Sequence, residues 1–237
     1  VVRRGLHGLA RTPLPKVVRM VALAAGIGVC DAVAVQGTPS MVAPAALLSL
    51  LLGLEVTEAL AQEIDHPDRT DALITERSAV LAQHLWVPAI TLVPLAVVAA
   101  GSAVAVAGGE ALGPAAIVAV PALWAGACGA VVSTVRDAAS PTGGDRQAAF
   151  VPPEMAGIQT ALRVIWPLVV SGLPSAVLLI ITASGSPIGG AIRAAVGSLL
   201  VCATTVVWVR TRDRVRASMA AFMAEGRTYT QQQRSIR

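Results

Sequence analysis

Long apolar runs, separated by short polar segments, constrain this sequence more than any other feature. They cover residues 17–35, 41–61, 85–107, 112–135, 164–183 and 188–209. Each run is close to the roughly 20 apolar residues that an α-helix needs to cross a bilayer. Charged residues make up only 14% of the chain and the mean hydropathy is +0.70, whereas about a quarter of a soluble domain is charged. We therefore predict an all-α integral membrane protein with six transmembrane helices.

The basic residues predict how these helices are oriented, because cytoplasmic segments of membrane proteins carry an excess of Lys and Arg. If the N-terminus is inside, every Lys and Arg except Arg193 belongs to the cytoplasmic side, and the three outside turns hold none. We therefore predict that both termini are cytoplasmic. The predicted parts are a basic N-terminal segment 1–16, a transmembrane domain 17–209 and a basic amphipathic tail 210–237.

The residue usage indicates a bacterial source and therefore the bacterial plasma (inner) membrane. Only one of the 18 basic residues, Lys16, is lysine, and Ala, Val and Gly are abundant, as a GC-rich genome produces. Because the sequence begins with Val, a GTG start codon and a fragment of a longer protein both stay open. The three cysteines lie far apart in apolar runs, which favours small core residues over disulfides or metal ligands.

A charged segment between the second and third runs breaks the apolar pattern. Between Glu55 and His84 it holds seven of the 14 acidic residues, together with two arginines and two histidines. Unpaired charges are costly in hydrocarbon, so we predict a cytoplasmic helical elbow at 62–84. Leu60 and Ile64 stand one helical turn apart and extend the second run as an amphipathic helix. Two interpretations stay open: a solvated connection between two helices, and a docking element for a soluble partner.

The order of elements here resembles that of permease subunits of ATP-binding-cassette exporters. The matching features are the second run, the sequence Glu63-Ile64-Asp65-His66-Pro67-Asp68-Arg69, a short helix, and a third run that contains Val87-Pro88. The similarity is greatest to the six-span class that exports drugs, polysaccharides or lipids. In that class the corresponding segment opens with an acidic residue and carries the coupling helix, which seats in a groove of the ATPase. The run Asp-His-Pro-Asp-Arg departs from the Gly-containing acidic-basic run that is common in the family.

This resemblance implies a permease subunit of an ATP-driven export system, in which the substrate crosses through the helix bundle. Its implied partners are a separate ATPase subunit that binds segment 62–84, a second permease copy or related half, and the lipid bilayer. ATP and Mg belong to that ATPase, because this chain has no G-x-x-x-x-G-K-[ST] phosphate loop, and no cofactor is expected in the chain itself. The candidate coupling residues are Glu63, Asp65, Asp68, Arg69, Asp71, Glu76 and Arg77.

Other functions have weaker support from the residues. There is no zinc-type histidine pair, nucleophile elbow or repeated acidic motif, so we predict no catalytic residue and no metal site. His66 and His84 are interpreted as ordinary solvated histidines. A membrane-embedded enzyme and a non-transporting assembly or regulatory protein remain the alternatives. Aromatic residues are too few to favour nucleic-acid binding.

Two further cytoplasmic parts have amphipathic patterns. Segment 136–162 is interpreted as a surface helix that leads into the fifth span, in preference to a second docking site. In the tail, apolar residues follow basic ones at helical spacing, which suits the anionic inner leaflet. The basic residues that we expect at the membrane surface are Arg210, Arg212, Arg214 and Arg216.

Two features inside the runs predict how the helices pack. Asp31 and Arg193 are ionisable and lie at similar depths below the outer surface, about 6 and 7.5 Å. They predict either an ion pair, within one chain or between two copies, or two side chains that reach the interface separately. Small residues at four-residue spacing predict close helix contacts within the bundle. They are Gly101, Ala105 and Gly109 in the third run, and Ala122, Gly126 and Ala130 in the fourth.

Overall fold

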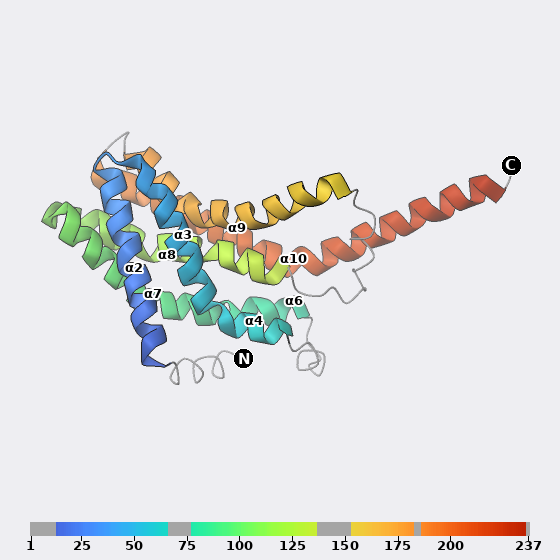
Figure 1. Cartoon of the computed structure of the whole chain (residues 1–237), viewed down its shortest axis with the longest axis horizontal. Helices are drawn as coiled ribbons and strands as arrows, with labels where there is room; N and C mark the ends of the chain where they lie inside the picture. The colour runs from blue at the N-terminus through green and yellow to red at the C-terminus, as the bar shows by residue number, and fades with distance from the viewer. Residues whose placement is uncertain (1–12, 66–76, 137–152, 183–185, 236–237) are drawn as a thin grey trace.

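The computed structural model describes residues 13–65, 77–136, 153–182 and 186–235, and within these ranges the regular elements are all helical (Figure 1). The fold class predicted from the sequence is confirmed for this part of the chain. The α-helices are α2 (Leu14–Val35), α3 (Val42–Val56), α4 (Glu58–Asp65), α6 (Arg77–His84), α7 (Trp86–Ala107), α8 (Leu112–Arg136), α9 (Pro153–Thr182) and α10 (Pro187–Ser235). Two short 3₁₀ helices, η1 (Pro39–Met41) and η2 (Gly109–Ala111), precede α3 and α8.

Five helices among the described residues are long and apolar enough to cross a membrane. They comprise Leu14–Val35, Pro39–Val56, Ser78–Ala107, Gly109–Arg136 and Pro187–Val215. In α9 the apolar stretch Ile165–Ile180 is shorter. Large apolar side chains face outward along these helices, including Val97 and Ile180, which are both 69% exposed. Because exposed apolar surface of this extent is typical of lipid contact, the chain has the architecture of a membrane protein.

The first two predicted outer turns coincide with observed chain reversals, and most of the third lies outside the described residues. Gly37 and Gly108 have φ angles of 115° and 89°, in the left-handed region that glycine adopts without a steric penalty. Gly108 ends α7 within a residue of the predicted boundary. The second run, in contrast, is divided at Thr57, where the hydroxyl donates to the Gly53 carbonyl at 2.9 Å and α4 begins. The tail is not a separate helix, because α10 continues through residue 209 to Ser235.

The helices form two groups that share α8. Figure 1 shows α7, α8, α9 and α10 running along the long axis, while α2 and α3 cross them. A core of buried residues joins α2, α3, α7 and α8, and includes Ile27, Leu52, Leu92 and Leu123. Trp124 seals its edge by donating from Nε1 to the Ala89 carbonyl at 3.0 Å. This group places the first four apolar runs in one tightly packed unit.

Small residues set the closest helix contacts, as predicted for the fourth run but not for the third. A Cβ atom on Gly126 would lie 3.0 Å from the Cβ of Ser49 in α3, and Ala130 is fully buried. Gly101 and Gly109 have no such neighbour within 4 Å among the described residues. The close contact of α7 instead uses Gly28 of α2, because a Cβ there would overlap the Ala99 carbonyl oxygen and the Ser102 hydroxyl. Because Ala and Gly are abundant in this sequence, the spacing of small residues did not indicate which face of the third run packs.

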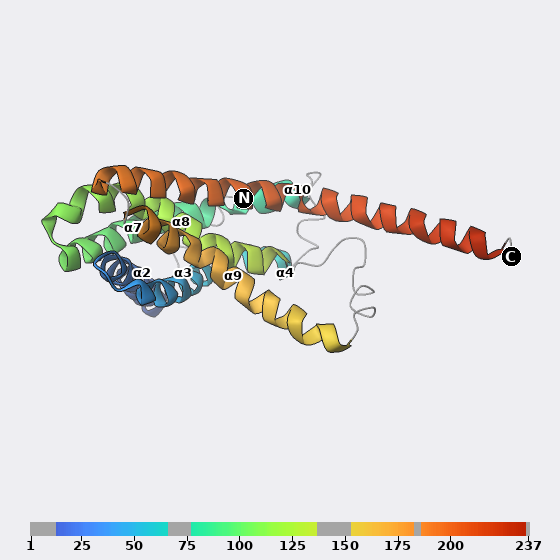
Figure 2. The same cartoon turned by 90° about the horizontal axis from the view of Figure 1, so that it is seen from above.

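The helices α9 and α10 separate toward the end of the bundle where α4 and α6 lie. They approach near Gly197, where a Cβ would lie 3.3 Å from Val177. Figure 2 shows the two helices diverging from there toward the C-terminal end of α10. Pro167 lies within α9, where it removes one backbone hydrogen bond and favours a bend. The divergence leaves space between α9 and α10 that the sequence did not predict.

Candidate functional site

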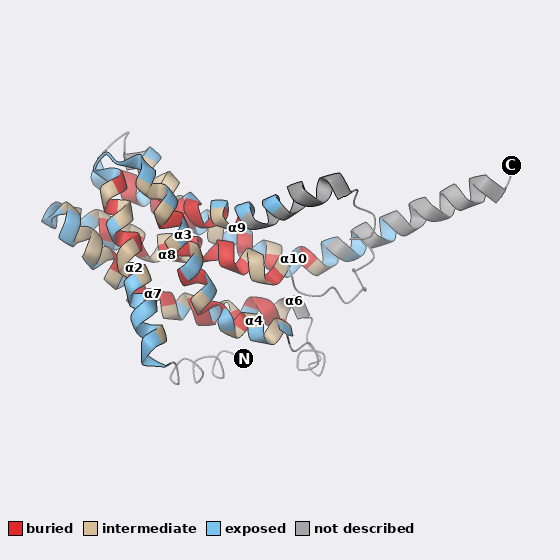
Figure 3. Ribbon diagram, in the orientation of Figure 1, coloured by how far each residue is buried: buried red, intermediate tan, exposed pale blue. Residues whose placement is uncertain are grey.

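The helices α4 and α6 form an elbow at one end of the bundle (Figure 1). Its inner side is apolar and packs against the end of α8 and the middle of α10. Leu60 of α4 and Leu81 of α6 are 1% and 2% exposed, and they belong to one cluster with Val135 of α8 and Val209 of α10. Figure 3 shows buried positions on both elbow helices. The predicted amphipathic elbow is therefore anchored to two long helices of the bundle.

The polar side of the elbow contains a buried histidine. His84 is 9% exposed, its Nδ1 lies 3.0 Å from the Val80 carbonyl oxygen, and its Nε2 lies 3.8 Å from a carboxylate oxygen of Glu63. The interpretation of His84 as a solvated residue is wrong, because α6 turns it toward α4. Glu63 thus faces the other helix of the elbow, although the sequence suggested it as a contact for a partner.

Other acidic residues of the charged segment pair within the chain. Lys16 contacts both Glu55 and Glu58, and Arg19 contacts Glu55 at 2.6 Å. These ion pairs connect the beginning of α2 to the junction of α3 and α4. Exposed pairs of this kind contribute about 0–1 kcal/mol each, so they orient α2 more than they stabilise it. Some charged residues of this segment therefore form ion pairs within the chain, and others are exposed.

Few of the candidate coupling residues lie in the described part of the chain. Asp65 is exposed at the end of α4, and Arg77 is the first residue of α6. Four others, Asp68, Arg69, Asp71 and Glu76, lie outside the described residues, as does His66. The assignment of these residues to a partner contact stays a prediction.

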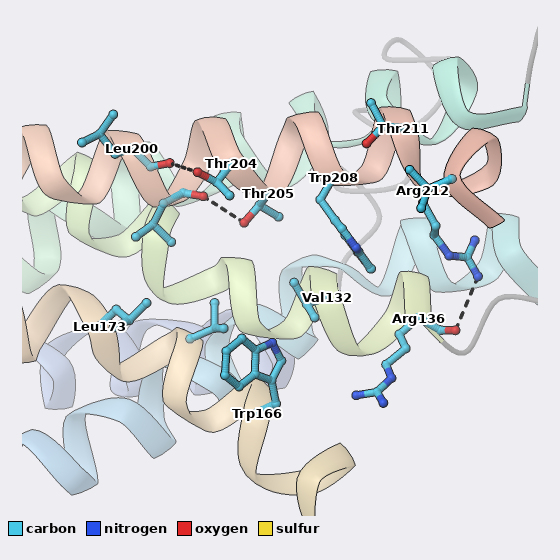
Figure 4. A pocket seen from close by; sticks show the side chains of 13 residues that line it. Val132, Arg136, Trp166, Leu173, Leu200, Thr204, Thr205, Trp208, Thr211 and Arg212 are labelled. Carbon is cyan, nitrogen blue, oxygen red and sulfur yellow. Dashed lines mark hydrogen bonds between the residues drawn. The ribbon is translucent and has the colours of Figure 1, made fainter. Parts of the chain in front are cut away.

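Beside the elbow lies a groove of about 740 Å³ between α8, α9 and α10 (Figure 4). Its floor includes Val132 of α8, and its walls carry Trp166 of α9 and Trp208 of α10, which extend into the space between the helices. Trp208 also packs against the buried cluster that anchors the elbow. The lining residues are Val132, Arg136, Trp166, Val170, Leu173, Leu200, Val201, Thr204, Thr205, Trp208, Thr211, Arg212 and Val215. Trp208 thus belongs both to the wall of the groove and to the packing around the elbow.

Two arginines stand at the elbow end of the groove. Arg212 is 5% exposed, and its Nη2 donates to the carbonyl of Arg136, the last residue of α8, at 3.4 Å. Its Nη1 lies 3.3 Å from Asp213. A cation at a helix C-terminus stabilises the unpaired carbonyls there. Arg212 is thus buried, whereas Arg210 and Arg214 are exposed, and the assignment of these residues to the membrane surface stays a prediction. The side chain of Arg216 is outside the description.

The intramembrane charges lie apart within the chain. Among the described residues no ion pair joins Asp31 to Arg193. Arg193 is exposed on α10, and the Oδ1 atom of Asp31 is buried without a hydrogen-bond partner. The hydroxyl of Ser175 in α9 faces the same carboxyl group. A serine in an apolar run gives no sequence signal of this proximity, and a bridge from Asp31 to Arg193 of another copy stays a prediction.

Comparison with known proteins gives no match: no family model, no curated protein and no solved structure is significantly similar to the chain. Within the described residues no three His, Cys, Asp or Glu side chains gather where they could hold a metal ion. The functional argument therefore rests on the elbow, the groove and their shared wall.

Proposed function

We propose that this chain is the six-span permease subunit of an ATP-binding-cassette export system in the bacterial inner membrane. In this proposal Ile165–Ile180 forms the core of the fifth span, both termini are cytoplasmic, and an ATPase subunit docks on segment 62–84. One observation carries the proposal: a charged elbow between two apolar helices is anchored through Leu60 and Leu81 to the bundle. The separate resemblance of the sequence around Glu63 to exporter permeases supports the same assignment.

The anchoring has a mechanical consequence for coupling. A docking element transmits force only if it is packed rigidly against the helices that move, because packed interfaces shift between discrete arrangements. Here Leu60 and Leu81 contact the cluster that contains Val135 and Val209. Movement of the elbow on ATP binding would therefore displace the end of α8 and the middle of α10 together. We propose that these two helices carry the signal from the ATPase to the translocation path.

The test is copurification of an ATPase subunit from the native membrane in mild detergent. Charge reversal at Asp68 and Asp71 should abolish the captured ATPase or uncouple its activity from transport. The matched control is Glu110→Lys, which reverses an acidic charge in η2 at the other end of the bundle and should leave capture unchanged. If the reversed protein assembles with the ATPase and stimulates it normally, the elbow is not the docking element.

A second variant separates docking from transmission. Leu81→Ala removes apolar volume between the elbow and the bundle but leaves the polar surface unaltered. We expect the ATPase to be captured in normal amount while its hydrolysis no longer responds to the permease. Loss of capture and of folded protein together would instead mean that Leu81 acts only through stability, and intact coupling would contradict the proposed transmission path.

A further inference from the structure

The groove between α8, α9 and α10 is chemically graded along its length. Near Leu200 and Leu173 its walls are aliphatic, and near Arg136 and Arg212 they are cationic. Trp208 and Trp166 lie between these ends (Figure 4). Tryptophan is enriched where the hydrocarbon of a membrane meets the headgroups, because its ring is apolar and its N–H is polar. The order of these residues therefore follows the order of environments in one leaflet of a bilayer.

The length of the groove also corresponds to one leaflet. Its lining residues on α10 extend from Leu200 to Val215, which is a rise of about 22 Å along the helix. A bilayer with its headgroups is about 40–45 Å thick, so a single leaflet is about 20–22 Å. A molecule that fills the groove therefore has an apolar part as long as an acyl chain and an anionic end.

We infer that this groove binds an anionic phospholipid of the inner leaflet, with its phosphate at Arg136 and Arg212 and one acyl chain along Val170, Leu173 and Leu200. Charge complementarity selects the headgroup, since among the lining residues only these two arginines are charged. Asp213 contacts Arg212 but does not line the groove. The lipid fills the space that opens where α9 leaves α10. This inference requires the membrane location but not the ATPase.

Tryptophan fluorescence gives a direct test, because two of the four tryptophans line the groove. A reporter protein carries Trp86→Phe and Trp124→Phe and is reconstituted in phosphatidylcholine vesicles. Part of the lipid is replaced by phosphatidylglycerol with brominated chains or, in parallel, by phosphatidylcholine with brominated chains. We expect stronger quenching by the brominated phosphatidylglycerol, with a preference of about fivefold for each arginine, the effect of one basic residue near an anionic surface.

Variants assign the preference to the groove. Arg136→Gln and Arg212→Gln should each lower it about fivefold, while Arg210→Gln, on the same helix but outside the groove, should leave it unchanged. Thr204→Phe fills the groove without altering charge and should reduce quenching by both lipids. Arg212 also holds the end of α8, so if Arg212→Gln fails to fold, Arg136→Gln and Thr204→Phe decide the question.

Three results would overturn the inference. Equal quenching by the two lipids in the reporter protein would mean that the groove does not select an anionic headgroup. A preference that survives Arg136→Gln but falls with Arg210→Gln would place the selection on the exposed tail. Quenching by both lipids that Thr204→Phe leaves unchanged would show that no acyl chain lies in the groove.

Discussion

The two sides of α8 are packed in different ways. Toward α2, α3 and α7 the helices meet at small residues, and the hydroxyl of Ser102 in α7 donates to the Ala25 carbonyl of α2 at 2.9 Å. Toward α9 and α10, α8 also packs closely, but α9 and α10 diverge from each other. A Cβ on Gly129 would overlap the Pro167 carbonyl, but beyond this point the walls carry Trp166 and Trp208 and a groove remains.

The difference shows which part of the helix bundle is tightly packed and which part leaves a groove. In lipid there is little hydrophobic force between helices, so association depends on close van der Waals contact and hydrogen bonds. Glycines at crossings such as Gly28 and Gly53 provide that contact on the closed side. Large side chains at the elbow end of α9 and α10 hold the helices apart on the open side. The elbow packs against α8 and α10, where the closed side and the open side meet.

The largest expected effect is a substitution at the closest crossing of the closed side. Gly28→Leu would drive a side chain into the backbone of α7 at Ala99, because even a Cβ atom overlaps that carbonyl oxygen. We expect a loss of about 3 kcal/mol in stability and a clear fall in folded yield. The measurement is thermal unfolding in detergent, with Gly101→Leu as the control, since Gly101 has no neighbour within 4 Å of its Cβ position. Equal melting temperatures for the two variants would contradict the closed packing.

The same substitution on the two sides sharpens the comparison. Leu92→Ala creates a cavity in the closed core, where Leu92 is 2% exposed, and we expect a loss of about 2 kcal/mol. Leu200→Ala trims the groove wall, where Leu200 is 63% exposed, and we expect a loss near zero. Both are measured as shifts in denaturant or thermal midpoint in the same detergent. A similar cost for the two variants would mean that the groove is closed in solution.

The smallest effect concerns the buried carboxyl group between the two sides. Asp31 has no cationic partner among the described residues, and a carboxylate with an unpaired oxygen in an apolar environment is costly. Asp31→Asn keeps the shape and removes the charge, so we expect an increase in stability of about 1 kcal/mol. Unfolding of the purified protein above neutral pH, where an exposed carboxyl group is ionised, measures it. A decrease, reversed by Arg193→Gln in the same chain, would instead show an ion pair between copies.

Much of the fold followed from the pattern of the sequence. A run of about 20 apolar residues satisfies its backbone only as a helix when it lies in lipid, so the helices around Trp86–Ala107 and Leu112–Arg136 were predicted within a residue or two. The amphipathic spacing of Leu60 and Ile64 likewise predicted an elbow helix, and Leu60 is buried as that pattern requires.

The candidate site was predicted less completely, because charge in a sequence does not indicate its partner. The acidic residues between Glu55 and His84 left two interpretations open, a solvated connection and a docking element, and indicated no partner within the chain. The structure instead pairs Glu55 and Glu58 with Lys16 of α2, and brings Glu63 to His84. These contacts join residues far apart in the chain or on separate helices, and no local periodicity contains them.

The sequence by itself determined that the described part of this chain is helical, where helices such as Trp86–Ala107 and Leu112–Arg136 begin and end, and that charges gather between the second and third runs. These properties depend on solvation and on hydrogen bonds within one segment, so they can be read locally. Only the tertiary structure decided that Gly28 and not Gly101 makes the close contact of the third run, that Arg212 turns inward to the end of α8, and that α9 leaves α10 to form a groove. Those outcomes depend on which faces of different helices meet, and a composition rich in Ala, Val and Gly offers many nearly equivalent faces.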